Sequence, residues 1–216
     1  MRNKFDYELQ ELNNNLVKMG VLCEDSISLA LSCFEAGSET TIEMVKAEEI
    51  RIDEYEKEIE RQCLKLLLQQ QPVAKDLRII SAALKMITDL ERIGDQALDI
   101  ADISRYIKKL NDNIKTMGAE AVRMLSMAID SFVKRDLELA KRTINCDDVV
   151  DSLFLEVRCD IIDLLKNETE GAETALDMLM IAKYLERIAD HAVNLSEWVI
   201  FSLTGVHKGG EYDSHS

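Results

Sequence analysis

Apolar positions recur every three to four residues along almost the whole chain, a spacing that is typical of amphipathic helices. The pattern predicts six long helices joined by short polar turns. Their expected spans are about 3–34, 38–70, 72–109, 114–133, 136–167 and 170–205. Because short connections make neighbouring helices antiparallel, we expect an all-α fold of six long antiparallel helices.

The predicted helix ends coincide with residues that start or stop helices. Gly37 suits the left-handed position that ends the first helix, and Ser38 suits the N-cap of the second. Pro72 suits the first turn of the third helix, where a missing N–H costs little. Residues 206–216 have no periodicity and are predicted to form a mobile tail.

The six predicted helices form two copies of a three-helix unit. In the first two helices the copies are 98 positions apart, which pairs Phe34 with Phe132, Glu49 with Asp147 and Asp53 with Asp151. In the third helix they are 95 apart, which pairs Glu91 with Glu186, Asp95 with Asp190, Asp99 with Asn194 and Asp102 with Glu197. The repeat predicts two tandem three-helix bundles, over residues 1–110 and 111–205.

Composition supports a helical fold and limits the class of partner. Only 5% of the residues are aromatic, and there are 8 Gly and 1 Pro, so turns and strands have little material. The formal charge of −15 argues against binding nucleic acid and against docking on anionic lipid through a basic patch. It is compatible with cations and with basic protein surfaces.

The cysteines and the N-terminal residues predict a cytoplasmic protein. The five cysteines are scattered without a Cys-x-x-Cys pair and are interpreted as reduced thiols in the core: Cys23, Cys33, Cys63, Cys146 and Cys159. The first fifteen residues lack the apolar stretch of a signal peptide, and no run approaches the roughly 20 apolar residues of a membrane span. Any contact with a membrane is therefore expected to run through partner proteins.

Acidic residues form a stripe on the third helix of each repeat. At about 100° per residue, the apolar residues of the first stripe-bearing helix gather on one side, as a core seam should: Leu90, Ile93, Ala97, Ile100 and Ala101. The acids fall largely on the other, outward face: Glu91, Asp95, Asp99 and Asp102. The second copy repeats the stripe with Glu186, Asp190, Asn194 and Glu197, and the preceding helices add the pairs Glu49 with Asp53 and Asp147 with Asp151.

Two interpretations of these stripes remain open, a solvated surface and a metal site. Like charges four residues apart repel each other on a helix, and the arrangement recurs in both copies. Two such pairs on neighbouring antiparallel helices can bring four carboxylates together, which suits a hard or borderline cation or a small metal cluster. Arg92 and Arg187 are expected to pair with Asp95 and Asp190, and His191 points away from the stripe.

The motifs that surround these acids resemble the PhoU family over about residues 1–205. The first repeat carries P-x-x-x-D-L-R at 72–78 and D-L-E-R-I-G-D at 89–95. The second carries Y-L-E-R-I-A-D-H-A-V-N-L-S-E at 184–197. The two motifs stand at equivalent places in a tandem three-helix architecture, which makes the resemblance specific.

The resemblance implies a cytoplasmic regulator with no reaction of its own. Family members restrain phosphate uptake and hold the phosphate-sensing histidine kinase in its phosphatase-favouring state. They contact that kinase and the ATPase subunit of the phosphate ABC transporter, and they commonly form homodimers.

The resemblance also implies multinuclear iron or zinc sites. Carried over by motif, one site would use Glu49, Asp53, Glu91 and Asp95, and the other Asp147, Asp151, Glu186 and Asp190. The flanking position is Asp99 in the first copy and Asn194 in the second, so the two sites could differ in affinity or nuclearity.

Three alternatives from other classes are weighed against this interpretation. A di-iron enzyme of the ferritin type needs Glu-x-x-His motifs, and no histidine here has a glutamate three residues before it. A helical bundle with carboxylate clusters could bind iron and have no role in phosphate regulation. A scaffold protein would have neither a metal site nor a phosphate role. Because no nucleophile or phosphate-cradling motif is present in the sequence, we expect no enzyme activity.

Overall fold

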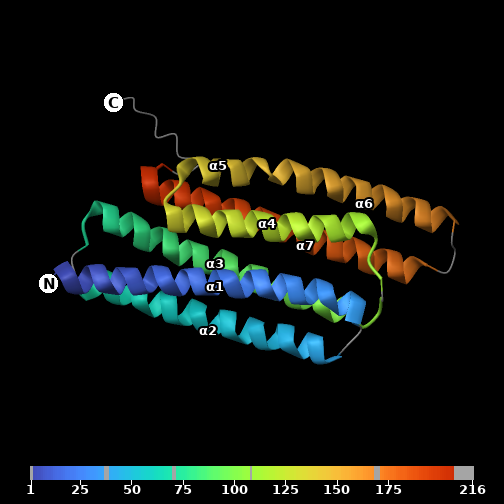
Figure 1. The fold of residues 1–216 in the computed structure, drawn as a ribbon, viewed down its shortest axis with the longest axis horizontal. Coiled ribbons are helices and arrows are strands. Elements are labelled where there is room, and N and C mark those ends of the chain that lie inside the picture. Colours follow the sequence, from blue (N-terminus) through green and yellow to red (C-terminus); the bar gives the residue numbers. More distant parts are fainter. Residues whose placement is uncertain (1, 37–38, 70–71, 108, 168–170, 207–216) are drawn as a thin grey trace.

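The computed structural model describes residues 2–36, 39–69, 72–107, 109–167 and 171–206, and its regular structure there is entirely α-helical. Seven segments follow in order: α1 (Arg2–Ala36), α2 (Glu39–Gln69), α3 (Ala74–Ile103), α4 (Asp112–Lys134), α5 (Leu137–Asn145), α6 (Asp147–Asn167) and α7 (Ala172–Thr204). They form an elongated bundle with α2 at one edge and α5 and α6 at the other (Figure 1). The all-α prediction is confirmed. Residues 207–216 of the predicted tail lie outside the described residues.

The predicted fifth helix is interrupted at Cys146, which ends α5 directly before α6 begins. Its backbone N–H donates to the carbonyl of Arg142 at 3.2 Å and to that of Thr143 at 3.0 Å, so the turn tightens there. The two pieces continue one another along the edge of the bundle (Figure 1). The break places Asp147 in the first turn of α6, where the helix dipole favours a negative charge.

The predicted third helix is too long at both ends. It begins at Ala74, two residues after Pro72, and ends at Ile103 rather than near residue 109. Beyond Ser104 the chain turns, and two apolar side chains of the connection, Ile107 and Leu110, are buried in the core. Burying them requires the chain to leave the helix axis, which periodicity alone does not reveal. The sixth predicted helix ends as expected, at Gly205 in the left-handed conformation.

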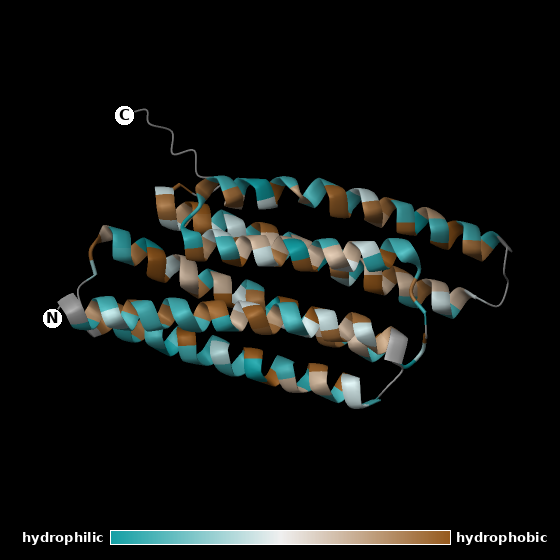
Figure 2. Ribbon diagram, viewed as in Figure 1, coloured by the Kyte–Doolittle hydropathy of each residue, from teal (hydrophilic) through white to brown (hydrophobic). Residues whose placement is uncertain are grey.

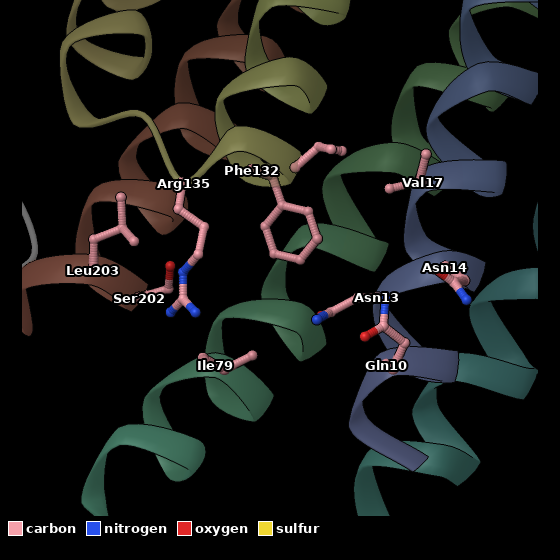
Figure 3. Close-up of a pocket in the computed structure, with 10 residues that line it drawn as sticks. Gln10, Asn13, Asn14, Val17, Ile79, Phe132, Arg135, Ser202 and Leu203 are labelled. Carbon is pink, nitrogen blue, oxygen red and sulfur yellow. The ribbon is translucent and has the colours of Figure 1, made fainter. Parts of the chain in front are cut away.

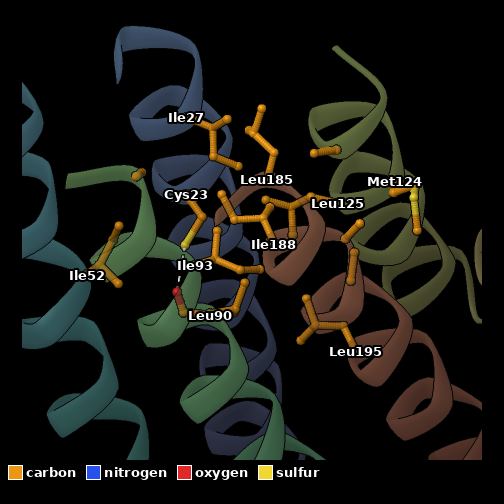
Figure 4. Packing of buried hydrophobic residues seen from close by; sticks show 14 of the residues in the cluster. Cys23, Ile27, Ile52, Leu90, Ile93, Met124, Leu125, Leu185, Ile188 and Leu195 are labelled. Atoms are coloured by element: carbon orange, nitrogen blue, oxygen red, sulfur yellow. Dashed lines mark hydrogen bonds between the residues drawn. The ribbon is translucent and has the colours of Figure 1, made fainter. Parts of the chain in front are cut away.

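One hydrophobic cluster runs through both repeats. The predicted seam of α3 is completely buried, and the equivalent face of α7 packs against it with Leu185, Ile188 and Leu195 (Figure 4). Each repeat uses the same internal packing, because α2 lies on α1 and α3 as α6 lies on α4 and α7. The two three-helix units are therefore joined through α3 and α7 around a shared core.

Three of the five cysteines fill this core as predicted. Cys23, Cys33 and Cys63 are buried free thiols, and the Cys23 thiol donates to the carbonyl of Leu90 at 3.3 Å (Figure 4). Burial raises the pKa of the Cys63 thiol to about 12, so it stays protonated and unreactive. The prediction is wrong for Cys159, which is exposed on α6.

Reciprocal polar contacts join α3 to α7. Asp89 on α3 accepts from Nδ2 of Asn194 at 3.2 Å and contacts Nδ1 of His191 at 2.8 Å. In the opposite sense, the pKa of the Tyr184 hydroxyl on α7 is raised first by burial and then by the nearby charge of Asp99 on α3. Asp89 and Tyr184 occupy equivalent repeat positions, as do Asp99 and Asn194. The two repeats thus meet in an approximately two-fold arrangement, in which a contact and its counterpart use the same positions.

Hydrophilic residues predominate along α2 and α5, whereas α6 mixes hydrophilic residues with exposed apolar ones (Figure 2). The central helices α3 and α7 are richer in apolar residues. Among the described residues, no helix combines the length and apolar character that a membrane span requires.

Candidate functional site

Four carboxylates from α2 and α3 converge in the first repeat, and we call them the first cluster: Glu49, Asp53, Glu91 and Asp95. Burial raises the pKa of Glu49, and the negative charges of Asp53 and Asp95 raise it further. The pKa of Glu91 is likewise raised, first by burial and then by Asp95. Charges on α2 and α3 thus influence one another at this cluster.

Four carboxylates from α6 and α7 form the equivalent second cluster: Asp147, Asp151, Glu186 and Asp190. Burial raises the pKa of Asp147 to about 6, with further contributions from Asp190 and Asp151. The pKa of Asp190 is raised by burial and then by Glu186. In each set of four, a charge on one helix raises the pKa of a carboxyl group on the other. The role of the eight carboxylates as metal ligands stays a prediction.

The clusters lie in the grooves between paired helices, so the prediction of a fully outward stripe is wrong for their first members. The side chain of Glu91 is only 19% exposed and that of Glu186 only 18%. Further along the same stripe, Asp99 and Asp102 are exposed as predicted. The angle of about 100° per residue gives the directions of side chains on one helix only. It does not show that a neighbouring helix covers the start of the stripe.

Gly94 explains how α2 approaches α3 closely at the first cluster. A Cβ on Gly94 would lie 2.9 Å from Cδ1 of Ile52, a distance at which side chains clash. In the second repeat the equivalent positions are Ala189 and Val150, both fully buried. The first repeat thus combines glycine with the larger isoleucine, and the second combines alanine with the smaller valine. This explains why the repeated hexapeptides differ at this one position, Gly94 against Ala189.

Basic side chains of the protein itself neutralise part of each cluster. Nζ of Lys57 lies 3.7 Å from Asp53, and Arg92 lies 3.4 Å from both Glu91 and Asp95. Lys183 pairs with Glu186 in the second cluster. As they stand, the described residues contain no group of three or more carboxylate, histidine or cysteine side chains arranged to hold a metal ion, so binding would require the side chains of each cluster to rearrange. A cation would have to displace the lysine and arginine side chains, all of which are at least half exposed and free to move.

One of the two predicted arginine pairs forms. Arg92 pairs with Asp95 as expected. No ion pair joins Arg187 to Asp190 within the described ranges. Arg187 instead lies close enough to Tyr184 to lower the pKa of its hydroxyl, against the larger effect of burial. The basic partner of the second cluster is Lys183, which precedes Glu186 by three residues as Arg92 precedes Asp95.

The flanking candidates and one unanticipated glutamate distinguish the clusters. Asn194 donates to Asp89 across the repeat interface, so its amide is already used. The charge of Asp99 raises the pKa of Asp95 and also that of the Tyr184 hydroxyl on α7. Glu56, which sequence reasoning missed, faces the first cluster and raises the pKa of Glu91. Its spacing of seven from Glu49 could have revealed it.

The second repeat has Phe154 at the position equivalent to Glu56. Nζ of Lys183 lies 5.6 Å from the centre of the Phe154 ring. The first cluster therefore has a neighbouring carboxylate at a position where the second has an aromatic ring. The two clusters differ in the groups that surround them.

The arrangement is chemically suited to binding cations. Carboxylate oxygens are preferred ligands of hard cations and also bind iron and zinc. Convergent negative charge destabilises the metal-free cluster, and a bound cation removes that repulsion. The residue types and their convergence fit a metal, while the basic side chains around them would have to move.

Comparison with known proteins gives one consistent result. The family model described as PhoU domain matches residues 16–104 and 114–199, one match in each repeat. A Clostridium acetobutylicum protein named phosphate-specific transport system accessory protein PhoU homolog is 35% identical over 213 residues, covering 94% of this chain and 96% of its own. A Thermotoga maritima protein with the same name, homolog 1, is 33% identical over 207 residues, covering 93% and 89%.

Two solved structures have the same fold. The crystal structure of PhoU from Pseudomonas aeruginosa matches with a TM-score of 0.88 and 27% identity, covering 94% of this chain and 100% of that one. The phosphate transport system regulatory protein PhoU from Streptococcus pneumoniae matches with a TM-score of 0.87 and 27% identity, covering 94% and 98%.

Proposed function

The chain belongs to the PhoU family, and we propose that it is an accessory protein of a phosphate transport system that negatively regulates phosphate uptake and phosphate-starvation signalling. The observation that carries this proposal is the match of both repeats to the family, together with relatives of nearly equal length that are named for that accessory role. A match restricted to one repeat would support only a shared structural unit.

The proposed mode of action is contact with two cytoplasmic partners, the ATPase subunit of the phosphate ABC transporter and the sensor histidine kinase. The formal charge of −15 favours partners with basic surfaces. A homodimer and a cytoplasmic location belong to the same proposal. No catalytic step is required, because binding alone can bias the activity of a partner.

The proposal includes a metal at each carboxylate cluster, with iron or zinc as candidates. Glu49, Asp53, Glu91 and Asp95 would hold one, and Asp147, Asp151, Glu186 and Asp190 would hold the other. The bound ion would supply positive charge and thereby reverse the local sign of the surface. The protein's own contribution is to hold four oxygens together on two rigid helices.

A co-purification experiment tests the proposed partners. Tagged full-length protein would be recovered from cells grown with ample phosphate, and co-purifying proteins identified by mass spectrometry against a tag-only control. We expect to recover the transporter ATPase or the sensor kinase. Its recovery should fall as added salt screens the charges, because the Debye length shrinks from about 10 Å at 0.1 M to about 3 Å at 1 M. Recovery of neither partner, together with tightly bound iron, would favour a metal-handling role instead.

A further inference from the structure

We propose that the cavity between the two repeats, lined by Arg135, Asn13, Gln10 and Ser202, is a binding site for inorganic phosphate. The cavity lies at one end of the molecule, where the first half of α1 and the start of α3 meet the ends of α4 and α7. It is separate from the carboxylate clusters, since no residue of either cluster lines it.

The cavity has room for a small oxyanion. Its volume is about 170 Å³, several times the roughly 30 Å³ that one water molecule occupies. Phe132 and Ile79 form an apolar wall, and polar side chains approach from α1, α7 and the α4–α5 turn (Figure 3). It lies between the repeats, so a ligand bound there would contact both of them.

Arg135 supplies a cation whose charge is not neutralised by a carboxylate. It forms no ion pair within the described part of the chain, although the sequence contains 41 acidic residues. All residues that line the cavity are described, and none is acidic. A guanidinium presents a rigid fork of donors that matches two oxygens of a phosphate.

The backbone of Arg135 has an unfavourable, left-handed conformation. Its φ of 53° makes it the one non-glycine residue with positive φ in the described ranges. This conformation is disfavoured for a residue with a Cβ. The position equivalent to Arg135 in the first repeat is Gly37, the residue type for which it is not disfavoured. Arginine in place of glycine at this turn is explained if the guanidinium has a ligand.

The amide groups explain why phosphate fits better than another oxyanion. Figure 3 shows Arg135 extending toward Ser202 while Asn13 is directed into the same space from α1. Gln10 and Asn14, which also line the cavity, carry amide oxygens that can accept a hydrogen bond. Phosphate at neutral pH retains at least one O–H and can donate to such an oxygen, whereas sulfate cannot.

A second arginine strengthens the positive potential beside the cavity. The guanidinium of Arg78 lies against the end of α7, where a Cβ on Gly205 would be 3.2 Å from its terminal nitrogen. Its Nε is buried and has no partner. Neither Arg78 nor Arg135 pairs with an acidic side chain among the residues that the structure describes, and two guanidinium groups at one end of a strongly acidic protein create a local field that attracts an anion.

Equilibrium dialysis of the metal-free full-length protein against radiolabelled orthophosphate tests the proposal. We expect saturable binding of one phosphate per chain, competed poorly by sulfate. The variant Arg135→Gly should bind at least tenfold more weakly, and Arg135→Lys should fall between the two because it keeps the charge and loses the fork. Glycine suits the left-handed turn, so Arg135→Gly should fold and should be at least as heat-stable as the parent.

A matched control separates this site from the metal clusters. The double variant Asp95→Asn with Asp190→Asn alters both clusters and should retain phosphate binding in full. Three results would each overturn the proposal: no saturable binding by the parent, unchanged binding by Arg135→Gly, or competition by sulfate as strong as that by phosphate. The assay contains no transporter and no kinase, so its failure would leave the proposed accessory role standing.

Discussion

Replacing Asp95 and Asp190 by asparagine should remove bound metal from the protein while leaving its helices intact. Each substitution takes one negative charge and one ligand oxygen from the centre of a four-carboxylate cluster. Affinity for iron or zinc should fall roughly tenfold or more at the altered cluster, as it does when metal sites lose supporting groups. Elemental analysis after gel filtration measures the bound metal, and circular dichroism measures the helical content.

The two single variants and one control make this result specific. Asp95→Asn should empty the first cluster and Asp190→Asn the second, so each should lose only part of the metal. Asp102→Asn makes the same change on α3 at a residue that pairs with Arg105 outside the cluster, and should lose none. Stoichiometric metal in the double variant, or equal loss from Asp102→Asn, would refute the ligand assignment.

Acidification of the metal-free protein from pH 7 to about pH 5 should increase its free energy of unfolding. The pKa of Asp147 is raised to about 6 in the folded protein from an ordinary 3.8, mainly by burial and then by Asp190 and Asp151. A carboxyl group with a raised folded-state pKa binds protons more tightly when folded. Its contribution to stability is therefore fully present below about pH 4 and is lost as the pH rises through 6.

The variant Asp147→Asn should for the same reason be more stable than the parent at pH 7, with a smaller advantage toward pH 4. Taken at face value the raised pKa corresponds to about 3 kcal/mol. Because the side chain is partly open to solvent, we expect about 1 kcal/mol. Urea unfolding at a series of pH values measures the difference.

A control substitution isolates the effect of the cluster. Glu173→Gln removes an exposed carboxylate from the first turn of α7, where the helix dipole favours negative charge, and should slightly reduce stability. If Asp147→Asn behaves like Glu173→Gln and also destabilises the protein at pH 7, the carboxylates of the second cluster do not repel one another as described.

The sequence pattern alone predicted the helical fold because apolar residues recur every three to four positions over long spans. The seam from Leu90 to Ala101 is buried as its spacing predicts. The local departures have tertiary causes. Ile107 and Leu110 leave the helix axis to reach the core, and the break at Cys146 depends on how α5 and α6 follow the bundle.

The candidate metal site was predictable in its members because the repeat doubled the evidence for each residue. What the sequence could not provide was the depth of the clusters and the identity of their basic partners. The Glu91 side chain is mostly buried where Gly94 lets α2 approach α3, and this closeness is a property of two helices together. Lys183 rather than Arg187 serves the second cluster, a choice between two side chains of similar reach.

The cavity at Arg135 could not be predicted from the sequence. Its residues come from four helices far apart in the chain, and none belongs to a recognisable motif. The one available signal was the replacement of a turn glycine, Gly37, by arginine in the second repeat. That signal becomes informative only when the left-handed conformation of Arg135 and the lack of acidic neighbours are known.

The central claim, that this protein restrains phosphate uptake, is tested most directly by the rate of radiolabelled phosphate uptake in cells with ample phosphate. The comparison is between the parent strain, a strain lacking this gene and any others of its family, and that strain carrying this gene alone. We predict that deletion raises uptake several-fold and that this chain restores the low rate. Uptake that is unchanged by deletion, or that stays high when this chain is restored, would contradict the account.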